Sequence, residues 1–497
     1  MPQFLASSTS CSKRAILDDT TLIRHQAYVD GRWTDGSGPD LITVTDPADG
    51  EVVGMVHALT AADAGDAVAA AERAFARYRR SMPAQRSAFL AAWHRHIVQA
   101  RDDLARLIVL EQGKPLAEAL GEVDYAAGFV AWYADAAERV TVEALASPFA
   151  DAETTLSRQP IGVAALLTPW NFPLAMITRK AAAAIAAGCP VVVLPSPETP
   201  FAALALAELA DRAGLPAGLF NVVSGAPAVV GPALCTHPAV RIVSFTGSTE
   251  IGRLVGAQCA ATVKKTVLEL GGHAPFIVCA DADLSAAVDA AIPAKFATSG
   301  QDCLAANRFL VHRSLYGPFV ARLAERIRAL RVGGGFEPGV DIGPLINARA
   351  VEKVERHVAD ALARGARLVL GGTRHGAGPL FFTPTLLCDV PSEALIFQEE
   401  TFGPVAAVTA FDEDDTAITT ANDTIYGLAA YLHARSPERI ERYLAALDFG
   451  MIAVNRTKIT GAPIPFGGVK QSGLGREGAR QGLEEFTTLK YVCRQSA

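Results

Sequence analysis

Three short segments of this chain carry the side chains needed for covalent chemistry on a carbonyl group. Cys303 follows a Ser-Gly-Gln turn at 299–301, and Glu269 stands directly before a Leu-Gly-Gly turn. Asn171 lies in a stiff Thr-Pro-Trp-Asn-Phe-Pro segment. A thiolate can attack a carbonyl carbon, an amide can stabilise the oxyanion that forms, and a carboxylate can activate water. Cys303, Asn171 and Glu269 are therefore the candidate nucleophile, oxyanion donor and general base.

These segments, in this order, resemble the aldehyde dehydrogenase superfamily, and the resemblance covers about residues 28–491. Glu269 and Cys303 lie 34 positions apart, which is the spacing usual in that superfamily. The resemblance implies an α/β fold with two parallel-sheet domains, one Rossmann-like for the cofactor and one catalytic, plus a small oligomerisation sheet. It also implies oxidation of an aldehyde to a carboxylic acid through a cysteine thioester, with hydride transfer to NAD or NADP.

The same resemblance implies a dinucleotide site, with NAD slightly preferred over NADP. The strand, glycine turn and helix start at 245–252 can receive a phosphate on backbone N–H groups. The Glu-Thr-Phe-Gly-Pro segment at 400–404 resembles the motif whose glutamate holds the nicotinamide ribose. The residues assigned to cofactor binding are Thr168, Pro169, Trp170, Ser196, Gly231, Phe245, Gly247, Ser248, Leu270, Glu400 and Phe402.

One part of the cofactor site departs from the family pattern. Leu194 stands where the family has a lysine that contacts the adenosine ribose, and Pro197 replaces the glutamate that favours NAD. Glu198 could serve instead, although the proline before it restricts its movement. Two missing hydrogen bonds at about 1–2 kcal/mol each would weaken cofactor binding by about one to three decades. The alternatives are a displaced cofactor, low affinity or impaired turnover.

The segments 175–180 and 465–478 resemble succinate-semialdehyde dehydrogenases. That resemblance implies an aldehyde with a distal carboxylate and assigns Arg179, Thr460 and Phe466 to the substrate site, because arginine binds carboxylates in a bidentate manner.

Ala297 replaces a second arginine usual in that subfamily, and this leaves space for a longer or bulkier ω-oxo acid. Arg456 and Lys458 are candidates to supply the missing positive charge, or both are solvated loop charges. In the nucleophile loop, Thr298 replaces the usual asparagine. Ala305 replaces a second cysteine found in some relatives, so a disulfide switch is not expected there.

Three other functions remain open at this stage. A coenzyme-A-acylating dehydrogenase is disfavoured by Glu269, because such relatives usually lack this base. A catalytically impaired or cofactor-altered homologue with a binding or structural role is suggested by Leu194 and Pro197 and opposed by the retained Cys303 and Asn171. A thioesterase-like or esterase-like hydrolase could use the same cysteine and base.

The composition of the chain argues against nucleic acid, membranes and metal ions as partners. The chain has 497 residues, half of them hydrophobic, and a formal net charge of −7, which provides no basic field for nucleic acid or an anionic membrane. The eight cysteines form no CxxC pair and no zinc-ligand spacing, so no metal is expected. Scattered thiols favour a reducing compartment, so we expect a cytoplasmic protein. The family resemblance implies a homodimer or homotetramer. The longest apolar run, 181–195, is too short for a membrane span, and residues 1–21 are expected to form a disordered tail.

Hydrophobic spacing predicts the elements that position these residues. Two helices are expected early, at 62–80 and 85–112, the first ended by Pro83 and the second by Gly113. Two separate runs of short apolar strands alternating with helices follow, which indicates two parallel sheets. The first run has strands at 163–167, 191–194, 220–223 and 242–245 with helices at 175–187 and 201–213. The second has strands at 275–278 and 309–312 with helices at 284–298 and 318–330.

The hinge between the two runs is expected near the glycine pair 271–272. Edge strands are expected at 154–159 and 485–492. The predicted division is a dinucleotide-binding domain of residues 1–140 and 160–270, a catalytic domain of residues 271–465, and an oligomerisation segment of residues 141–159 and 466–497.

Overall fold

The computed structural model describes Lys13 and residues 16–137 and 142–496. Most of the tail predicted at 1–21 lies outside the described residues, but its end is packed and not disordered. Lys13 pairs with Asp46 at 2.7 Å, and Leu17 is buried. The backbone N–H groups of Asp18 and Asp19 both bond to the Asp103 carboxylate.

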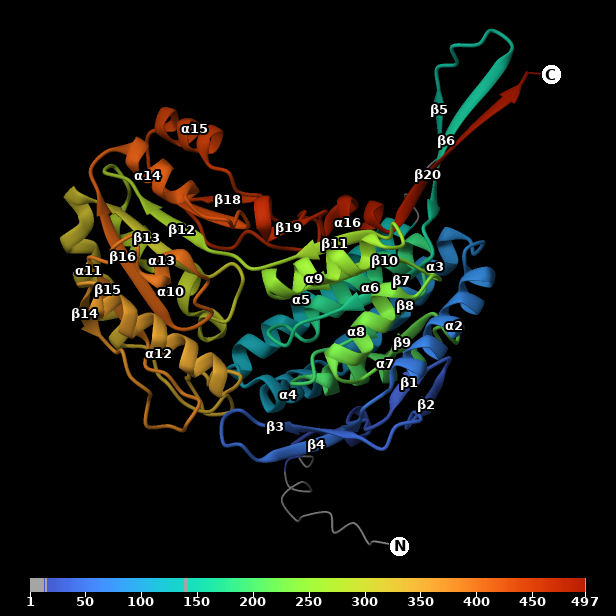
Figure 1. The fold of residues 1–497 in the computed structure, drawn as a ribbon, viewed down its shortest axis with the longest axis horizontal. Coiled ribbons are helices and arrows are strands. Elements are labelled where there is room, and N and C mark those ends of the chain that lie inside the picture. Colours follow the sequence, from blue (N-terminus) through green and yellow to red (C-terminus); the bar gives the residue numbers. More distant parts are fainter. Residues whose placement is uncertain (1–12, 14–15, 138–141, 497) are drawn as a thin grey trace, which may run out of the picture.

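An eight-stranded sheet forms the centre of the larger body, with the order β19-β11-β10-β7-β8-β9-β1-β2 (Figure 1). The five inner strands run parallel, and antiparallel strands close both edges. The two central strands β7 and β8 are entirely apolar because helices cover both faces of a parallel sheet. The strands are β1 (Ala27–Val29), β2 (Arg32–Thr34), β7 (Val163–Leu167), β8 (Val191–Leu194), β9 (Phe220–Val222), β10 (Val240–Thr246), β11 (Lys265–Glu269) and β19 (Gly473–Leu474).

The helices of this body are α2 (Ala61–Tyr78), α3 (Pro83–Gln99), α4 (Arg101–Gln112), α5 (Leu116–Ala136), α6 (Ala175–Ala187), α7 (Pro200–Arg212), α8 (Pro227–Thr236) and α9 (Thr249–Ala260). The helix predicted at 85–112 is two helices, because the backbone leaves the helical region at Ala100 (φ −90°, ψ 14°). Pro83 begins α3 and does not end α2; proline is well suited to a first helical position. Gly113 ends α4 in the left-handed region, as predicted.

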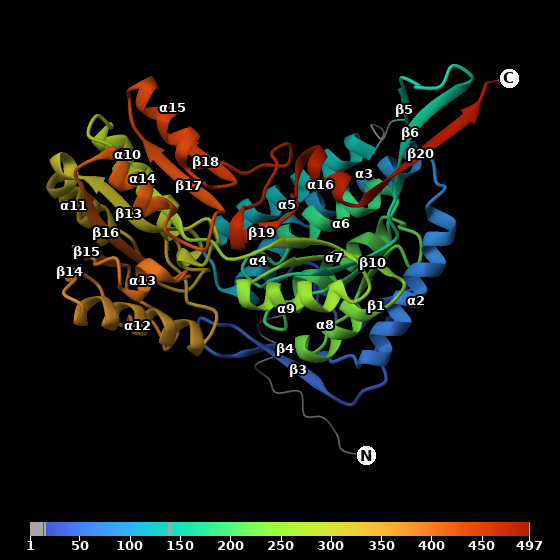
Figure 2. The ribbon, with the colours of Figure 1, turned by 45° about the horizontal axis from the view of Figure 1, so that its top comes forward.

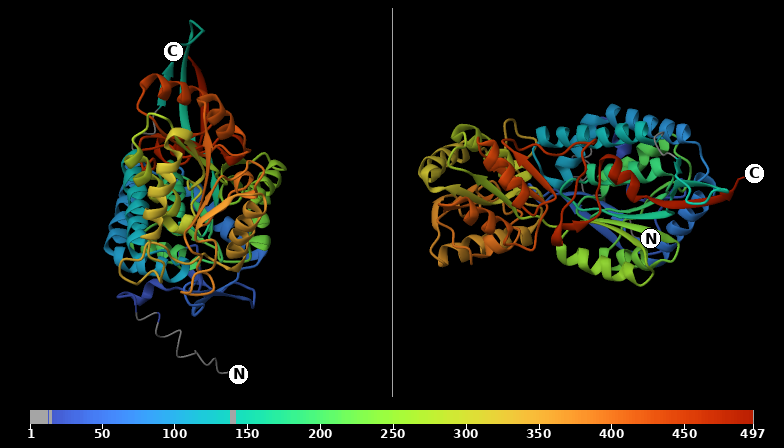
Figure 3. Two further views of the ribbon diagram at one scale, coloured as in Figure 1. Left: turned by 90° about the vertical axis from the view of Figure 1, so that its left-hand side faces the viewer. Right: turned by 90° about the horizontal axis from the view of Figure 1, so that it is seen from above.

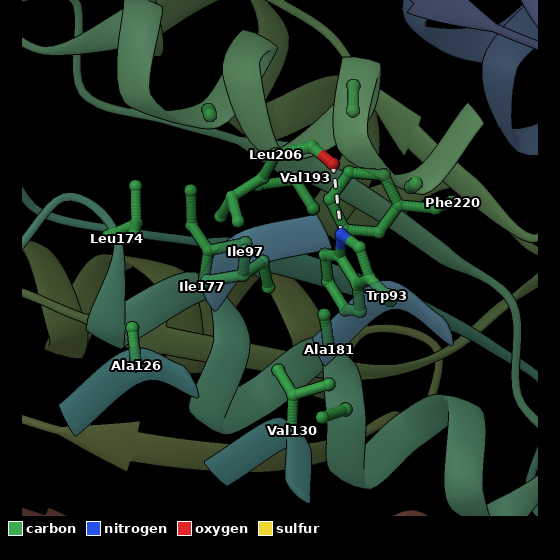
Figure 4. Close-up of a cluster of buried hydrophobic side chains, with 14 of the residues drawn as sticks. Trp93, Ile97, Ala126, Val130, Leu174, Ile177, Ala181, Val193, Leu206 and Phe220 are labelled. Carbon is green, nitrogen blue, oxygen red and sulfur yellow. Dashed lines mark hydrogen bonds between the residues drawn. The ribbon is translucent and has the colours of Figure 1, made fainter. Parts of the chain in front are cut away.

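Large apolar side chains fill the space between α3, α5, α6 and α7 and the strands β8 and β9 (Figure 4). Trp93 stacks edge-on against Phe220, and its indole N–H donates to the Leu206 carbonyl at 3.1 Å. This bond satisfies the one polar atom of the buried indole. The packing fixes α5 and α6, both of which reach the candidate site.

A seven-stranded sheet forms the second body, with the order β14-β15-β16-β13-β12-β17-β18. All of its pairings are parallel except β14 with β15. Its strands are β12 (Ala274–Val278), β13 (Ala306–His312), β14 (Arg367–Leu370), β15 (Thr385–Cys388), β16 (Val405–Phe411), β17 (Ala429–His433) and β18 (Met451–Val454). Its helices are α10 (Leu284–Phe296), α11 (Arg313–Arg328), α12 (Ala348–Ala363), α13 (Leu395–Gln398), α14 (Asp414–Asn422) and α15 (Pro437–Ala446).

The predicted α/β class with parallel sheets is confirmed, and Figures 2 and 3 show the two bodies side by side. β11 of the first sheet ends at Glu269 and β12 of the second begins at Ala274, so the chain crosses between bodies at the predicted glycine pair. The predicted domain boundaries stay a prediction. The segment assigned to oligomerisation also supplies β19 to the first sheet and the short helix α16 (Ala479–Glu485).

A third, antiparallel sheet of β20 (Thr487–Gln495), β6 (Ala152–Pro160) and β5 (Val142–Leu145) projects from the larger body (Figures 1 and 2). Both segments predicted from alternation are strands, but only β20 is an edge strand; β6 is the central strand, because it pairs with β20 on one side and β5 on the other. The remaining pair, β3 (Leu41–Thr45) with β4 (Val52–His57), forms a separate ribbon. Exposed apolar side chains on the projecting sheet and its connecting loop are Leu145, Phe149, Leu489, Tyr491 and Val492.

Within residues 16–137 and 142–496, the structure has no helix whose length and apolar character would let it traverse a bilayer.

Candidate active site

A cavity of about 730 Å³ lies between the bodies built on the two large sheets. Its wall combines α5, the loops after β7 and β10, the nucleophile loop, the start of α12 and the loops after α13 and β18. Most of the predicted site residues meet there: Pro169, Trp170, Asn171, Arg179, Gly247, Ser248, Leu270, Cys303, Glu400, Phe402, Thr460 and Phe466. Residues as far apart in sequence as Pro169 and Phe466, which are 297 positions apart, thus share one cavity.

Five predicted site residues do not line the cavity: Thr168, Ser196, Gly231, Phe245 and Glu269. The Phe245 side chain is part of the buried core beneath the first sheet. Gly231 lies inside α8, where an added Cβ would meet only one side-chain atom, at 4.0 Å, so no close contact requires glycine there.

The nucleophile loop follows α10, which ends at Phe296 and not at 298 as predicted. Thr298 and Ser299 both adopt left-handed backbone angles (φ 50° and 56°). Such angles cost about 1–3 kcal/mol each for residues other than glycine, and asparagine tolerates them better than threonine. The Thr298 N–H donates to the Glu118 carboxylate at 2.9 Å, and Ser299 Oγ donates to the Gly343 carbonyl at 2.9 Å. These contacts hold the strained turn that presents Cys303.

The backbone at Cys303 lies directly against the hinge. A Cβ at Gly272 would stand 2.0 Å from the Cys303 carbonyl oxygen, so only glycine allows this approach. The Gln301 side chain secures the other side, because its oxygen accepts the Ile346 N–H at 2.9 Å. Cys303 itself is partly exposed to the cavity.

Asn171 is buried in the cavity wall, and its position is fixed from two directions. Its side-chain Nδ2 donates to the Gln301 carbonyl at 3.1 Å, two residues before the thiol. Its own carbonyl accepts a hydrogen bond from Lys114 Nζ at 2.8 Å. The amide is therefore held beside the nucleophile loop, as an oxyanion donor requires.

Glu269 is 2% exposed, and neither carboxyl oxygen has a hydrogen-bond partner among the described residues. Burial, followed by the nearby charge of Glu477, raises the pKa of Glu269 well above its ordinary value. Arg179 and Lys180 oppose this shift but also pair with Glu477, whose pKa they lower despite its burial. Two carboxyl groups with opposite shifts are typical of an acid/base site.

The side chain of Glu269 occupies space left by a glycine. Its Oε1 is 2.8 Å from the position that a Cβ on Gly467 would take. The next residues, Leu270 and Gly271, line the cavity. The carboxyl group therefore lies next to residues of the cavity wall and does not itself line the cavity.

Burial, followed by the charges of Asp302 and Glu400, raises the pKa of the Cys303 thiol well above its ordinary value, and Arg179 opposes the shift. Only the thiolate reacts with alkylating agents. We therefore expect alkylation of Cys303 by iodoacetamide to increase about tenfold per pH unit from pH 7 to pH 9 without a plateau. Peptide mass mapping separates this cysteine from the exposed Cys493. A rate that levels off by pH 9, as expected for an ordinary thiol with a pKa of about 8.5, would contradict the raised pKa.

Arg179 lies on α6 and is almost completely buried. Its Nε donates to Glu477 at 2.7 Å, and its guanidinium carbon lies 4.1 Å from the centre of the Phe466 ring. Its Nη1 is buried without a hydrogen-bond partner among the described residues. An unpaired buried donor is costly, so this nitrogen is suited to a ligand acceptor in the cavity.

Ala297, which replaces the second arginine of the resembled subfamily, lies in the same cavity wall as Arg179. Ala297, Lys458 and Thr460 line the cavity, whereas Arg456 does not. The Lys458 ammonium makes no ion pair with any described residue. Of the two candidate cations in this loop, only lysine is placed to meet a ligand.

The other end of the cavity has the features of a dinucleotide site. Gly247 and Ser248 lie at the N-terminus of α9, and Ser248 caps it by accepting the Ile251 N–H at 3.3 Å. Free N–H groups of a first helical turn bind phosphate. The Glu400 carboxylate accepts the Gly272 N–H at 2.8 Å and faces the cavity.

The region assigned to the adenosine ribose lacks the lysine and the glutamate that Leu194 and Pro197 replace. The Leu194 side chain is packed in the core and cannot form a hydrogen bond. Ser196 Oγ donates to the Glu198 carboxylate, so the glutamate lies over the end of β8 despite the preceding proline. Thr168 bonds to Leu194 through its backbone, and its buried hydroxyl has no partner among the described residues. The unpaired Thr168 hydroxyl and the Glu198 carboxylate follow the carboxyl ends of the neighbouring strands β7 and β8. Both groups can form hydrogen bonds with the hydroxyl groups of a ribose.

Several wall residues were missed from the sequence. Glu118, Glu122 and Tyr125 lie on α5 at spacings of four and three, which places them on one helix face, and this polar stripe was a usable signal. The segment 346–353 carries no pattern that distinguishes it. Three exposed apolar side chains outside the cavity wall, on the mutually packed helices α8 and α9, were also missed: Val229, Ile251 and Leu254.

Comparisons with known proteins agree with this geometry. Residues 33–492 match the model of the aldehyde dehydrogenase family. The chain is 53% identical over 96% of its length, and 97% of the relative's, to an aspartate-semialdehyde dehydrogenase (non-phosphorylating) of Halomonas elongata. It is 49% identical to the NADP(+) succinate-semialdehyde dehydrogenase GabD of Escherichia coli, over 96% and 99% of the two chains. A crystal structure of an E. coli NADP-dependent enzyme superposes with a TM-score of 0.96 at 49% identity, over 96% of this chain and all of the other.

Proposed function

Because the chain belongs to the aldehyde dehydrogenase family of NAD(P)-dependent oxidoreductases, we propose that it oxidises a short aldehyde whose far end carries an anion. The observation that carries this proposal is the buried, unpartnered Nη1 of Arg179 in the cavity that also holds Cys303. A cation already desolvated and lacking one partner binds a carboxylate or similar anion without a further desolvation cost for itself.

In the proposed reaction, the Cys303 thiolate adds to the aldehyde carbon through Sγ, and the carbonyl oxygen becomes an oxyanion. The Asn171 amide and the Cys303 backbone N–H stabilise that charge. When bound, NAD(P) supplies the hydride acceptor. The carbon that has lost its hydride is a thioester on Cys303. Glu269 takes a proton from water as the oxygen attacks, the C–S bond breaks, and the carboxylic acid and the thiolate are released.

The residues present fit the cofactor. The N-terminal turn of α9 would receive a phosphate, Glu400 would hold the nicotinamide ribose, and Glu198 with the Thr168 hydroxyl would meet the adenosine ribose. A carboxylate at the adenosine ribose accepts hydrogen bonds from the ribose hydroxyl groups and repels the 2′-phosphate of NADP. We therefore propose a modest preference for NAD over NADP. The named relatives include NADP-dependent enzymes, and both cofactors therefore belong in the assay.

Two named relatives act on aldehydes that share a four-carbon skeleton and differ by an amino group, aspartate semialdehyde and succinate semialdehyde. Ala297 leaves room for a substituent, and Lys458 supplies a second cation. We propose that the distal anion lies between Arg179 and Lys458. A panel of both aldehydes and longer ω-oxo acids, each with NAD and NADP, tests this assignment.

We expect Lys458→Ala to raise KM about tenfold for anionic aldehydes and to leave KM for propanal, which lacks the anion, unchanged. Arg179→Met should raise KM for anionic aldehydes more strongly, because that cation is buried. Arg456→Ala is the matched control, since Arg456 lies on the same loop outside the cavity. Equal effects of Lys458→Ala on charged and neutral aldehydes would contradict the assignment.

The remaining alternatives have distinct outcomes. Thioester formation that needs coenzyme A for release would indicate the acylating reaction. Ester hydrolysis without reduced cofactor from any aldehyde would indicate a hydrolase. Absence of NAD and NADP binding by tryptophan fluorescence would favour a binding or structural role. The proposed homodimer or homotetramer, assembled through the projecting sheet, is decided by light scattering.

A further inference from the structure

Lys114 and Glu122 form a buried ion pair that the proposed reaction does not use. Lys114 Nζ and Glu122 Oε2 are 2.6 Å apart, and each side chain is 1% exposed. Lys114 lies in the turn between α4 and α5, and Glu122 lies in the second turn of α5. Replacing a buried ion pair with apolar residues often leaves stability unchanged or increases it, so stability alone explains this pair poorly.

The contacts of the pair converge on the loop that carries Asn171. Lys114 Nζ donates to the Asn171 carbonyl at 2.8 Å and lies 4.0 Å from the centre of the Phe172 ring. Glu122 Oε1 accepts the N–H groups of Leu174 at 2.9 Å and Ala175 at 3.3 Å. The cation thus holds the start of this loop, and the anion holds its end at the N-terminus of α6, where the helix dipole favours a negative charge.

A continuous chain of hydrogen bonds then leads to the backbone of the loop that carries the thiol. Glu122 orients Lys114, Lys114 fixes the Asn171 backbone, and the Asn171 amide donates to the Gln301 carbonyl at 3.1 Å. An oxyanion donor must be placed to within a fraction of an ångström, and a misplacement of about 1 Å can cost about 10²-fold in rate.

We propose that Lys114 and Glu122 are positioning residues that set the orientation of the Asn171 amide toward the oxyanion. This inference rests on the role proposed above for Asn171. It assigns to the ion pair an effect on kcat rather than on substrate affinity, because neither charge is free to bind substrate.

The test is a double-mutant cycle. We expect Lys114→Met to lower kcat about ten- to hundredfold with KM nearly unchanged, and Asn171→Ala to lower kcat about 10²- to 10³-fold. The double variant should be no slower than Asn171→Ala alone, because Lys114 acts through that amide. Multiplied effects in the double variant would overturn the inference and leave the role of Asn171 intact. An unchanged kcat in Asn171→Ala would overturn both.

Two further variants provide a substitute for Lys114→Met and a control. Glu122→Gln keeps an oxygen for the Leu174 N–H but removes the charge that orients Lys114, so the same cycle can use it if Lys114→Met does not fold. Arg86→Met is the matched control. Arg86 is a buried cation that donates to the Ala187 carbonyl at 2.9 Å, at the opposite end of α6. It should lower Tm and leave kcat within about twofold; a kcat loss equal to that of Lys114→Met would overturn the inference.

Discussion

Cys303→Ala is expected to lower kcat for aldehyde oxidation by at least about four orders of magnitude. The variant retains the cavity, the α9 N-terminus and Glu400, so cofactor binding should stay within about threefold of the parent. The loss is large because the thiolate forms the covalent bond on which both halves of the reaction depend. Stopped-flow absorbance of the reduced cofactor and fluorescence titration of NAD measure the two quantities separately.

Cys493→Ala is the control for this variant, since Cys493 is an exposed thiol on β20, remote from the cavity wall. It should keep full activity. Aldehyde oxidation by Cys303→Ala at a rate within tenfold of the parent would mean that another group attacks the carbonyl.

Glu269→Gln is expected to separate the two halves of the reaction. The thioester should still form, giving a burst of reduced cofactor stoichiometric with active sites, and steady-state turnover should then fall about 10²- to 10⁴-fold. The parent should lose turnover as the pH drops through the raised pKa of Glu269, because protonation removes the base. The variant should lack that limb of the pH profile.

Glu208→Gln serves as the control, because Glu208 is a buried carboxylate paired with Arg24 and Arg212 and lies outside the cavity. It should leave both the burst and the steady state unchanged. A Glu269→Gln enzyme without a burst would place the defect before thioester formation and would contradict the assigned role.

The alternation of short apolar strands with helices was sufficient to predict both parallel sheets, because each inner strand must be buried on both faces. The spacing of hydrophobic residues did not predict helix α5. Its mean composition is strongly apolar, it packs against both α3 and α6, and a helix buried on several sides has no clear amphipathic period. The break at Ala100 was also missed, since it involves neither glycine nor proline.

The candidate site was predictable where a residue stands in a local motif. Asn171, Arg179, Cys303 and Glu400 are such cases, and the structure brings all four to one cavity. The supporting residues were not predictable, because their partners are distant in sequence. Lys114, for example, contacts Asn171 across 57 positions. The orientation of Glu269 behind the cavity wall depends on the backbone at Gly467 and could not be deduced from its own motif.

The central claim is that the aldehyde carbon becomes bonded to the sulfur of Cys303. Peptide mass spectrometry of the Glu269→Gln enzyme, quenched in acid after mixing with cofactor and an anionic aldehyde, measures this directly. The account predicts the mass of the corresponding acyl group on the peptide that contains Cys303 and on no other peptide. An unmodified Cys303 peptide after a full burst of reduced cofactor, or an acyl group on a different side chain, would contradict it.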